Sequence, residues 1–185
     1  MGKHEKPPQQ VQSPEEKREH LHAMMKALPN VMLGTYENVG VRPLLRSRPM
    51  HVSQIDDDTS IWVVTALDGD AAKQVDACDV AVVCAQSGMR YVSINGRAAV
   101  VSDRVKLAAL WTPMHQVWFP NGPQDPNAVL IHFVPTEAEL WDVSGASVFR
   151  YLFDAAKALI SKTTPPQHEG THATVTLQGA DRGHT

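Results

Sequence analysis

Apolar residues recur with a helical period at the start of the chain, in residues 13–28 (SPEEKREHLHAMMKAL). Ser13 is suited to cap the first turn, Pro14 fits the first helical position, and Glu16 completes a capping box. The pattern therefore predicts an amphipathic helix that packs on the rest of the molecule. Its apolar stripe consists of Leu21, Met24, Met25 and Leu28.

From residue 30 onward the pattern changes to extended segments bounded by turn residues, which predicts β-strands. The segments VMLGTYE and VRPLLRSRPMHVS form a predicted hairpin with Gly40 in its turn. SIWVVTAL is a third strand, DVAVVCAQ is apolar enough for a fully buried strand, and MRYVSINGRAAVVSD is a long strand with a kink near Gly96. The segments AVLIHFVP and TEAELWDV are predicted as a final pair of strands.

Two short helices are predicted between these strands, one in DAAKQVDAC and one that starts at Asp103 and runs to Trp111. The segment TPMHQVWFPNGPQDPN, which follows them, is rich in Pro and Gly and is predicted to be a long loop. Many strands with few helices favour a mainly β fold, a β-barrel with flanking helices, over an alternating parallel α/β sheet.

The length of 185 residues suits one domain with terminal extensions. Residues 1–12 are polar and contain two prolines, so we expect a disordered N-terminal tail. Residues 13–162 are expected to form the barrel domain, including a terminal helix in 147–160 that has an apolar stripe. Residues 163–185 are expected to be a partly ordered C-terminal extension, because ATVTL has the pattern of a strand.

The 17 Lys and Arg nearly balance the 20 Asp and Glu, so the overall charge indicates neither nucleic acid nor an anionic membrane as a partner. No targeting segment or membrane span is recognisable, which predicts a soluble cytoplasmic protein. Cys78 and Cys84 are expected to be free thiols, and the scattered histidines predict no metal site. The motifs GxGxxG and GxxxxGKS/T are absent, so ordinary Rossmann and P-loop sites are not predicted.

Three arginines, Arg42, Arg46 and Arg48, occupy even positions in the strand VRPLLRSRPMHVS. Because side chains of a strand alternate between its two faces, these arginines would share one face and attract an anion. Arg48, Thr65 and Lys73 could converge on a phosphate if their elements are neighbours in the fold. The alternative is a set of solvated side chains on an edge strand. Neither Arg42 nor Arg46 receives a role from the sequence.

Several motifs follow one another in an order that a known family shares. They are RPM at 48–50, IWVVT ending at Thr65, a helix that opens with Lys73, and SINGRAAVVSD at 93–103. This order resembles the pyridoxamine 5'-phosphate oxidase-like, FMN-binding split barrels. The pattern LW-P-WFP-G-DP within 110–126, followed by AELWD at 138–142, is similar to the general stress protein 26 branch of that family.

The resemblance implies a split barrel that forms a homodimer and binds one FMN in each of two clefts between the subunits. Arg48 and Lys73 would hold the phosphate, the residues after Arg48 would run beside the isoalloxazine ring, and Trp141 would reach the flavin from the partner subunit. Packing in the core or the dimer is the alternative for the tryptophans. The cofactor-binding residues that the resemblance implies are Arg48, Pro49, Met50, His51, Val64, Thr65, Lys73, Trp118 and Trp141.

Two departures from the oxidase pattern bear on function. Ser53 stands five residues after Arg48, where the oxidases have a lysine, and the Arg-x-His-x-Arg run that binds the vitamer is missing after Trp141. The resemblance therefore implies an FMN-dependent oxidoreductase with a different substrate, in which the protein orients the flavin. The alternatives are a protein that stores or senses flavin without turnover, and a dimeric scaffold with a lapsed pocket. FAD, a deazaflavin and haem are alternative cofactors, and no catalytic residue is assigned.

Overall fold

The structure, a computed structural model, describes residues 13–39, 42–142 and 172–177. The predicted tail 1–12, the turn at Gly40 and the predicted terminal helix of 147–160 lie outside the described residues. Most of the predicted extension 163–185 lies outside them as well.

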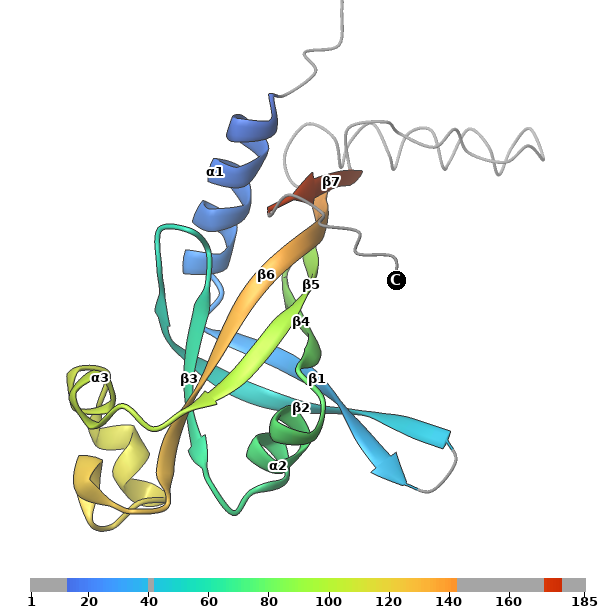
Figure 1. Ribbon diagram of the computed structural model, residues 1–185. Coiled ribbons are helices and arrows are strands. Elements are labelled where there is room, and N and C mark those ends of the chain that lie inside the picture. Colours follow the sequence, from blue (N-terminus) through green and yellow to red (C-terminus); the bar gives the residue numbers. More distant parts are fainter. Residues whose placement is uncertain (1–12, 40–41, 143–171, 178–185) are drawn as a thin grey trace, which may run out of the picture.

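The described residues form one antiparallel sheet that closes into a barrel (Figure 1). Its strands are β1 (Asn30–Val39), β2 (Arg42–Ile55), β3 (Ile61–Ala66), β4 (Val80–Ser87), β5 (Arg90–Val101), β6 (Ala128–Asp142) and β7 (His172–Thr176). The strand order is β3-β2-β1-β4-β5-β6-β7, and an additional pairing of β3 with β6 closes a ring of six strands. β7 pairs with the other end of β6. The expectation of a mainly β barrel with flanking helices is confirmed.

Short helices flank this barrel in the described part of the chain. They are the α-helices α1 (Pro14–Lys26), α2 (Asp70–Ala77) and α3 (Arg104–Ala109), and the 3-10 helices η1 (Pro113–Val117) and η2 (Gly122–Gln124). The two 3-10 helices occupy the segment that the sequence predicted as a long loop. None of the helices in the described ranges is long and apolar enough to cross a membrane.

Helix α1 has the predicted cap and the predicted buried face. Ser13 Oγ accepts a hydrogen bond from the Glu16 backbone N–H, and the Glu16 carboxylate accepts one from the Ser13 backbone N–H. Since both bonds satisfy backbone donors that a helix start leaves free, the helix begins where the capping box predicts. The predicted apolar stripe belongs to the main hydrophobic core, with exposed fractions of 0–4% for Leu21, Met24, Met25 and Leu28.

The prediction of two final strands was wrong, because β6 is one continuous strand of 15 residues. Pro135 suggested a break, since proline lacks the N–H that a sheet ladder uses. In the structure Pro135 lies opposite Gly96, at a register shift between β5 and β6. There is no room for a side chain at Gly96, where an added Cβ would lie 2.4 Å from the Val134 carbonyl oxygen. The register shift lies at Gly96, where the sequence predicted a kink, and the extra residue is Thr136 of β6, directly after Pro135.

The prediction that DVAVVCAQ is fully buried was also wrong. Ala81 and Val83 point into the core with exposed fractions of 4% and 1%, whereas Val80 is 44% exposed. The strand β4 thus alternates between a buried face and a more accessible face. Alternation follows from the barrel, because each strand presents only one face to the interior.

A second apolar cluster lies outside the barrel, where α3 and η1 cover β3 and the start of β6. Leu107, Leu110 and Phe119 are buried there together with Ala128 and Leu130. Trp62, Val64 and Ala66 project toward this cluster, while Ile61 and Val63 of the same strand belong to the barrel core. Strand β3 therefore has apolar packing on both faces, and this packing places η1 beside the middle of β2 and the end of β3.

Candidate functional site

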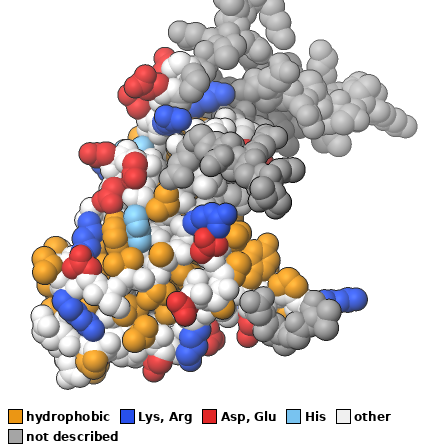
Figure 2. Space-filling view, in the orientation of Figure 1, with side chains coloured by type: hydrophobic (Ala, Val, Ile, Leu, Met, Phe, Trp, Pro, Cys, Tyr) orange, Lys and Arg blue, Asp and Glu red, His pale blue; other side chains and the backbone are white. Residues whose placement is uncertain are grey.

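A pocket of about 440 Å³ lies between the middle of β2, the end of β3 and the segment around η1. We call it the β2–β3 pocket. It is lined by Pro49, Met50, His51, Val64, Thr65, Ala66, Met114, His115, Trp118, Phe119 and Asn127. Its volume falls in the range that binds small molecules and cofactors. Figure 2 shows apolar side chains over the lower part of this face, with acidic and basic side chains scattered among and around them.

His115 is the most deeply buried polar side chain of the pocket, with an exposed fraction of 7%. Its Nδ1 accepts a hydrogen bond of 3.0 Å from the Thr112 backbone N–H. A backbone N–H can only donate, so neutral His115 carries its proton on Nε2. Burial lowers the pKa of His115, and the nearby His51 lowers this pKa further. The ring is therefore held neutral with an Nε2–H donor.

His51 lies on β2 and lines the same pocket. Its Nδ1 is 3.2 Å from Asn30 Oδ1, at the start of β1. Because an amide oxygen only accepts, Nδ1 of His51 is the donor in this contact and Nε2 remains an acceptor. The two histidines of the pocket therefore have opposite tautomers.

Arg48 precedes the pocket residues on β2 and is half-buried against β1 and α2. Its guanidinium donates to Thr35 Oγ1 at 2.8 Å and to Gln74 Oε1 at 2.5 Å. Thr35 is fully buried and also donates to Gln74, at 2.7 Å. These two hydrogen bonds position the guanidinium. Because both acceptors are neutral, they do not compensate its positive charge. Three of the five N–H groups of a guanidinium remain for another partner.

The other two arginines of β2 are separate from this group. Arg46 donates to the Glu37 carboxylate at 2.6 Å across the β1–β2 hairpin; the Arg46 side chain is exposed and that of Glu37 is partly exposed. Arg42 is exposed near the end of the hairpin. The anion-attracting face predicted for the three arginines thus reduces to Arg48, since Arg46 already has a carboxylate partner.

The remaining predicted site residues are distributed over the fold. Lys73 is exposed on α2, next to Gln74, and its side chain makes no hydrogen bond or ion pair with the described residues. Trp118 lines the pocket and is 67% exposed. Trp141 is half-buried on β6, thirteen residues beyond Ala128, which is up to roughly 44 Å along an extended strand. It pairs with Tyr91 and β7, so it does not reach the pocket of its own chain.

The structure therefore brings together six of the nine predicted residues, Pro49, Met50, His51, Val64, Thr65 and Trp118. Arg48 is adjacent in the chain, while Lys73 and Trp141 lie outside the pocket lining. Sequence reasoning missed the five lining residues Ala66, Met114, His115, Phe119 and Asn127. His115 had one available signal, because T-P-M-H has the spacing of a capping box that begins at Thr112.

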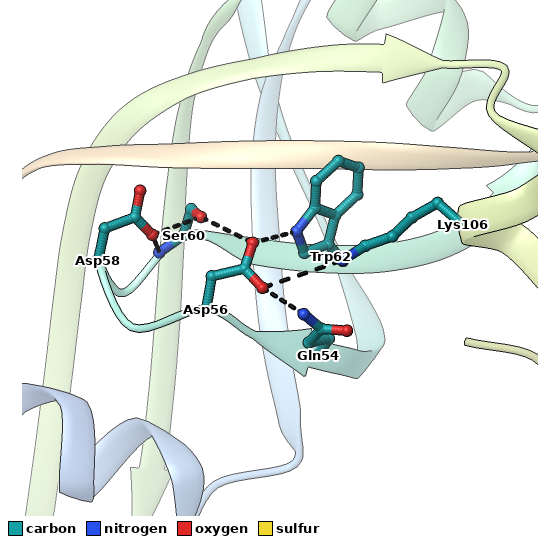
Figure 3. A network of polar contacts seen from close by, with 6 residues as sticks. All are labelled: Gln54, Asp56, Asp58, Ser60, Trp62 and Lys106. Atoms are coloured by element: carbon teal, nitrogen blue, oxygen red, sulfur yellow. Dashed lines mark hydrogen bonds and ion pairs between the residues drawn. The ribbon is translucent and has the colours of Figure 1, made fainter. Parts of the chain in front are cut away.

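A different polar group surrounds Asp56, at the turn from β2 to β3 (Figure 3). Asp56 accepts a bond of 2.6 Å from Trp62 Nε1 and another from the Gln54 amide, and Lys106 extends from α3 to within 4.0 Å of its carboxylate. The Ser60 hydroxyl donates to Asp58 at 2.6 Å. We call these residues the Asp56 network.

The carboxylates of the Asp56 network are held in their charged form. Burial raises the pKa of Asp56, but hydrogen bonds from Trp62 and Gln54 and the charge of Lys106 together place this pKa below its ordinary value of 3.8. The Ser60 hydroxyl and backbone N–H lower the pKa of Asp58. These groups are already satisfied by one another, so the network offers few free donors or acceptors to a ligand.

Solved structures of similar shape come from bacterial proteins. A protein from Jannaschia sp. CCS1 assigned to general stress protein 26 has 29% identity and a TM-score of 0.64, over 88% of this chain and 99% of that chain. The general stress FMN/FAD binding protein of Xanthomonas citri has 25% identity and a TM-score of 0.59, over 71% of this chain and 92% of that chain.

A third structure shows the fold at lower identity. The pyridoxamine 5'-phosphate oxidase-related, FMN binding protein of Nostoc punctiforme has 12% identity and a TM-score of 0.56, over 94% of this chain and 99% of that chain. The barrel is thus the split barrel that the motifs implied. No curated protein matches the chain. The family pattern described as pyridoxamine 5'-phosphate oxidase like matches residues 16–166. The chain therefore belongs to the pyridoxamine 5'-phosphate oxidase-like family and resembles its general stress protein 26 branch.

Proposed function

We propose that this protein binds FMN in the β2–β3 pocket and acts as a flavin-dependent oxidoreductase. One observation carries the proposal: six residues that the family resemblance implies for the flavin line a single pocket in this fold. They come from β2, β3 and the end of η1, which are far apart in the sequence. A chance grouping of solvated side chains would not produce a common cavity of small-molecule size.

The residues of the pocket suit the two ends of FMN. Met50, Val64 and Phe119 provide apolar and aromatic contacts for a flat ring. Arg48 lies one residue before the lining, and its free N–H groups suit a phosphate dianion. Lys73 is the second proposed phosphate contact, as an unpaired ammonium on the helix that also carries Gln74. Thr65 is proposed to add backbone and hydroxyl contacts.

The homodimer is part of the proposal. Trp141 lies too far along β6 to enter the pocket of its own chain, so a role at the flavin requires a second copy. Apolar side chains that are exposed in the single chain support an association surface, among them Leu45, Val117 and Trp118 at 59%, 76% and 67% exposure. Analytical ultracentrifugation of the flavin-loaded protein tests this part, and a monomer with full flavin content would contradict it.

When bound, FMN would supply hydride or electron transfer. The chain's own residues would hold the ring between β2 and η1, fix the phosphate through Arg48, and shield one side of the ring from water through Phe119 and Trp118. The missing Arg-x-His-x-Arg run argues for a substrate other than the vitamer.

Flavin binding is tested with protein purified under native conditions and then titrated with FMN. The Arg48→Ala, Lys73→Ala double variant should lose at least about a hundredfold in FMN affinity, because it removes two charge-assisted contacts to the phosphate. Riboflavin, which lacks the phosphate, should bind this variant and the parent protein alike. Arg48→Ala removes the donor to Thr35 and one of the two donors to Gln74, so the titration with riboflavin also serves to show that the variant is folded.

A matched control removes the same charge elsewhere. Arg46→Ala with Lys26→Ala deletes one arginine and one lysine outside the pocket and should leave FMN affinity unchanged. Absence of FMN binding to the parent protein would refute the flavin site, and equal loss in both double variants would refute the phosphate assignment. Steady-state reduction assays with nicotinamide cofactors then separate an oxidoreductase from a flavin-storing or flavin-sensing protein. Mass spectrometry of the retained ligand distinguishes FMN from FAD.

A further inference from the structure

The β2–β3 pocket contains no charged side chain. Its lining is mainly apolar, and its polar side chains are His51, Thr65, His115 and Asn127. Asn127 is already engaged, because its amide oxygen accepts from the Asp68 backbone N–H and its amide nitrogen donates to the Asp68 carboxylate. A ligand in this pocket therefore presents an uncharged surface, and the two histidines are the ring systems available to form directional bonds with it.

The tautomers of these histidines are fixed from outside the pocket. Thr112 donates its backbone N–H to His115 Nδ1, which leaves Nε2–H as the remaining donor of that ring. The hydroxyl of Thr112 lies 3.3 Å from the same Nδ1. Asn30 Oδ1 accepts from His51 Nδ1, which leaves Nε2 as the remaining acceptor of that ring. One wall of the pocket thus offers a donor and another offers an acceptor.

The two rings are close enough to interact through their charges, since His51 contributes to lowering the pKa of His115. The neutral form of His115 that this favours matches the absence of charged side chains from the lining. A donor near an acceptor suits a ligand edge in which a carbonyl lies beside a ring N–H.

We infer that His115 and His51 recognise the polar edge of a flat heterocycle, with His115 Nε2–H donating to a carbonyl and His51 Nε2 accepting from the adjacent ring N–H. The ligand class is a cyclic imide or lactam fused to an aromatic system. The inference rests on the proposed function, because the isoalloxazine of a flavin carries such an edge. It assigns to His115 a recognition role that its position in the η1 capping box does not require.

Two substitutions at His115 distinguish the proposed hydrogen bond from Nε2–H to the ligand from the capping bond that Nδ1 accepts from Thr112. The amide oxygen of His115→Asn can still accept from the Thr112 backbone N–H, but the side chain is too short to replace the Nε2–H donor. The amide of His115→Gln can replace that donor, and it gives up the cap. With lumiflavin as the probe, we expect His115→Asn to lose about tenfold in affinity and His115→Gln to keep most of it. Greater loss in His115→Gln than in His115→Asn would assign a structural role to His115 and overturn the inference.

The proposed acceptor role of His51 Nε2 is tested with a ligand whose ring N–H has been replaced by a methyl group. Lumiflavin should bind the parent protein about tenfold more tightly than lumiflavin methylated at the imide nitrogen, and this preference should disappear in His51→Phe. Equal affinity of the two rings for the parent protein would overturn the inference. Isothermal titration calorimetry measures all of these affinities without any turnover.

The same titrations distinguish this inference from the proposed function. If FMN binds and depends on Arg48 while the histidine variants and the methylated ring change nothing, the edge recognition is wrong and the flavin site stands. If neither FMN nor lumiflavin binds the parent protein, both are wrong. Loss of lumiflavin affinity in His115→Asn, with the same factor lost for FMN, supports both.

Discussion

Both the Asp56 network and the β2–β3 pocket have a tryptophan with a histidine nearby, but the two tryptophans are in different conditions. In the network, Trp62 stacks on His132 with ring centroids 3.9 Å apart and donates its Nε1–H to Asp56. In the pocket, Trp118 is 67% exposed, and the Nε2–H of His115 remains available. The residue types alone therefore do not distinguish a structural cluster from a binding site. What distinguishes them is the tryptophan and the carboxylate: Trp62 and Asp56 satisfy each other, although Nε2 of His132 is buried without a hydrogen-bond partner among the described residues, whereas Trp118 is left exposed in the pocket.

The cause of the difference is local geometry. Asp56, Ser60 and Trp62 lie within six residues of one another around the β2–β3 turn, so the chain can satisfy their polar atoms over a short distance. Lys106 completes the group from α3, with its ammonium 4.8 Å from the Trp62 ring. The pocket instead assembles residues from separate elements around a cavity. We therefore expect the network to determine stability and the pocket to determine binding.

Removing the central carboxylate should have the largest effect on stability. Asp56→Ala leaves Trp62 Nε1 and the Gln54 amide without their acceptor, so we expect a loss of about 2 kcal/mol in the free energy of unfolding. Urea denaturation measures it, and Asp57→Ala is the matched control, because Asp57 is exposed and adjacent. FMN affinity of the folded Asp56→Ala protein should not change. A coupled loss of FMN affinity would contradict the separation of the two regions.

Acid should destabilise the protein in two steps. Burial lowers the pKa of His132 below its ordinary value of 6.5. The charges of Asp56 and Asp58 raise this pKa and the charge of Lys106 lowers it, but the net change is downward. The unfolded chain then binds more protons, so the stabilisation is present above about pH 6.5 and is lost as the pH falls through the folded pKa. The lowered pKa values of Asp56 and Asp58 give a second loss below 3.8.

Urea denaturation across this pH range measures both steps. His132→Phe retains a ring beside Trp62 and removes the titrating group, so the first loss should become shallower in this variant. His115 contributes to the same step because burial lowers its pKa as well. Free energies of unfolding that do not change between pH 8 and pH 5 would contradict the assignment.

A smaller effect is expected when the Trp62 donor alone is removed. Trp62→Phe keeps an aromatic ring against His132 and loses the N–H that bonds to Asp56, at an expected cost of about 1 kcal/mol. Combined with Asp56→Ala, the two costs should be less than additive, because the variants remove the same bond. Full additivity in a double-mutant cycle would show that the bond contributes nothing.

The smallest effect on stability is expected in the pocket. Trp118→Ala should change the free energy of unfolding by no more than about 0.5 kcal/mol, because the side chain is mostly exposed. The same change should lower FMN affinity several-fold by removing an aromatic wall of the proposed site. A large loss of stability with unchanged FMN affinity would reverse the roles assigned to the two regions.

Local signals in the sequence predicted much of the fold. The capping box at Ser13 and the hairpin before β3 both depend on residues near one another in the chain. The two errors arose where a distant partner overrides the local pattern. Pro135 is tolerated because β5 changes register opposite it, and β4 alternates because the closed barrel buries only one of its faces.

The sequence, through its resemblance to the family, predicted which residues of β2 and β3 would be grouped, since Pro49 to His51 and Val64 to Thr65 lie in or beside the motifs that carry the resemblance. Only the tertiary structure decided the wall that η1 contributes, the tautomer of His115 and the bonds that hold Arg48 against Thr35 and Gln74. The physical reason is that packing between the elements decides where a cavity is left and which hydrogen-bonding groups beside it have no partner. That depends on contacts between elements far apart in the chain.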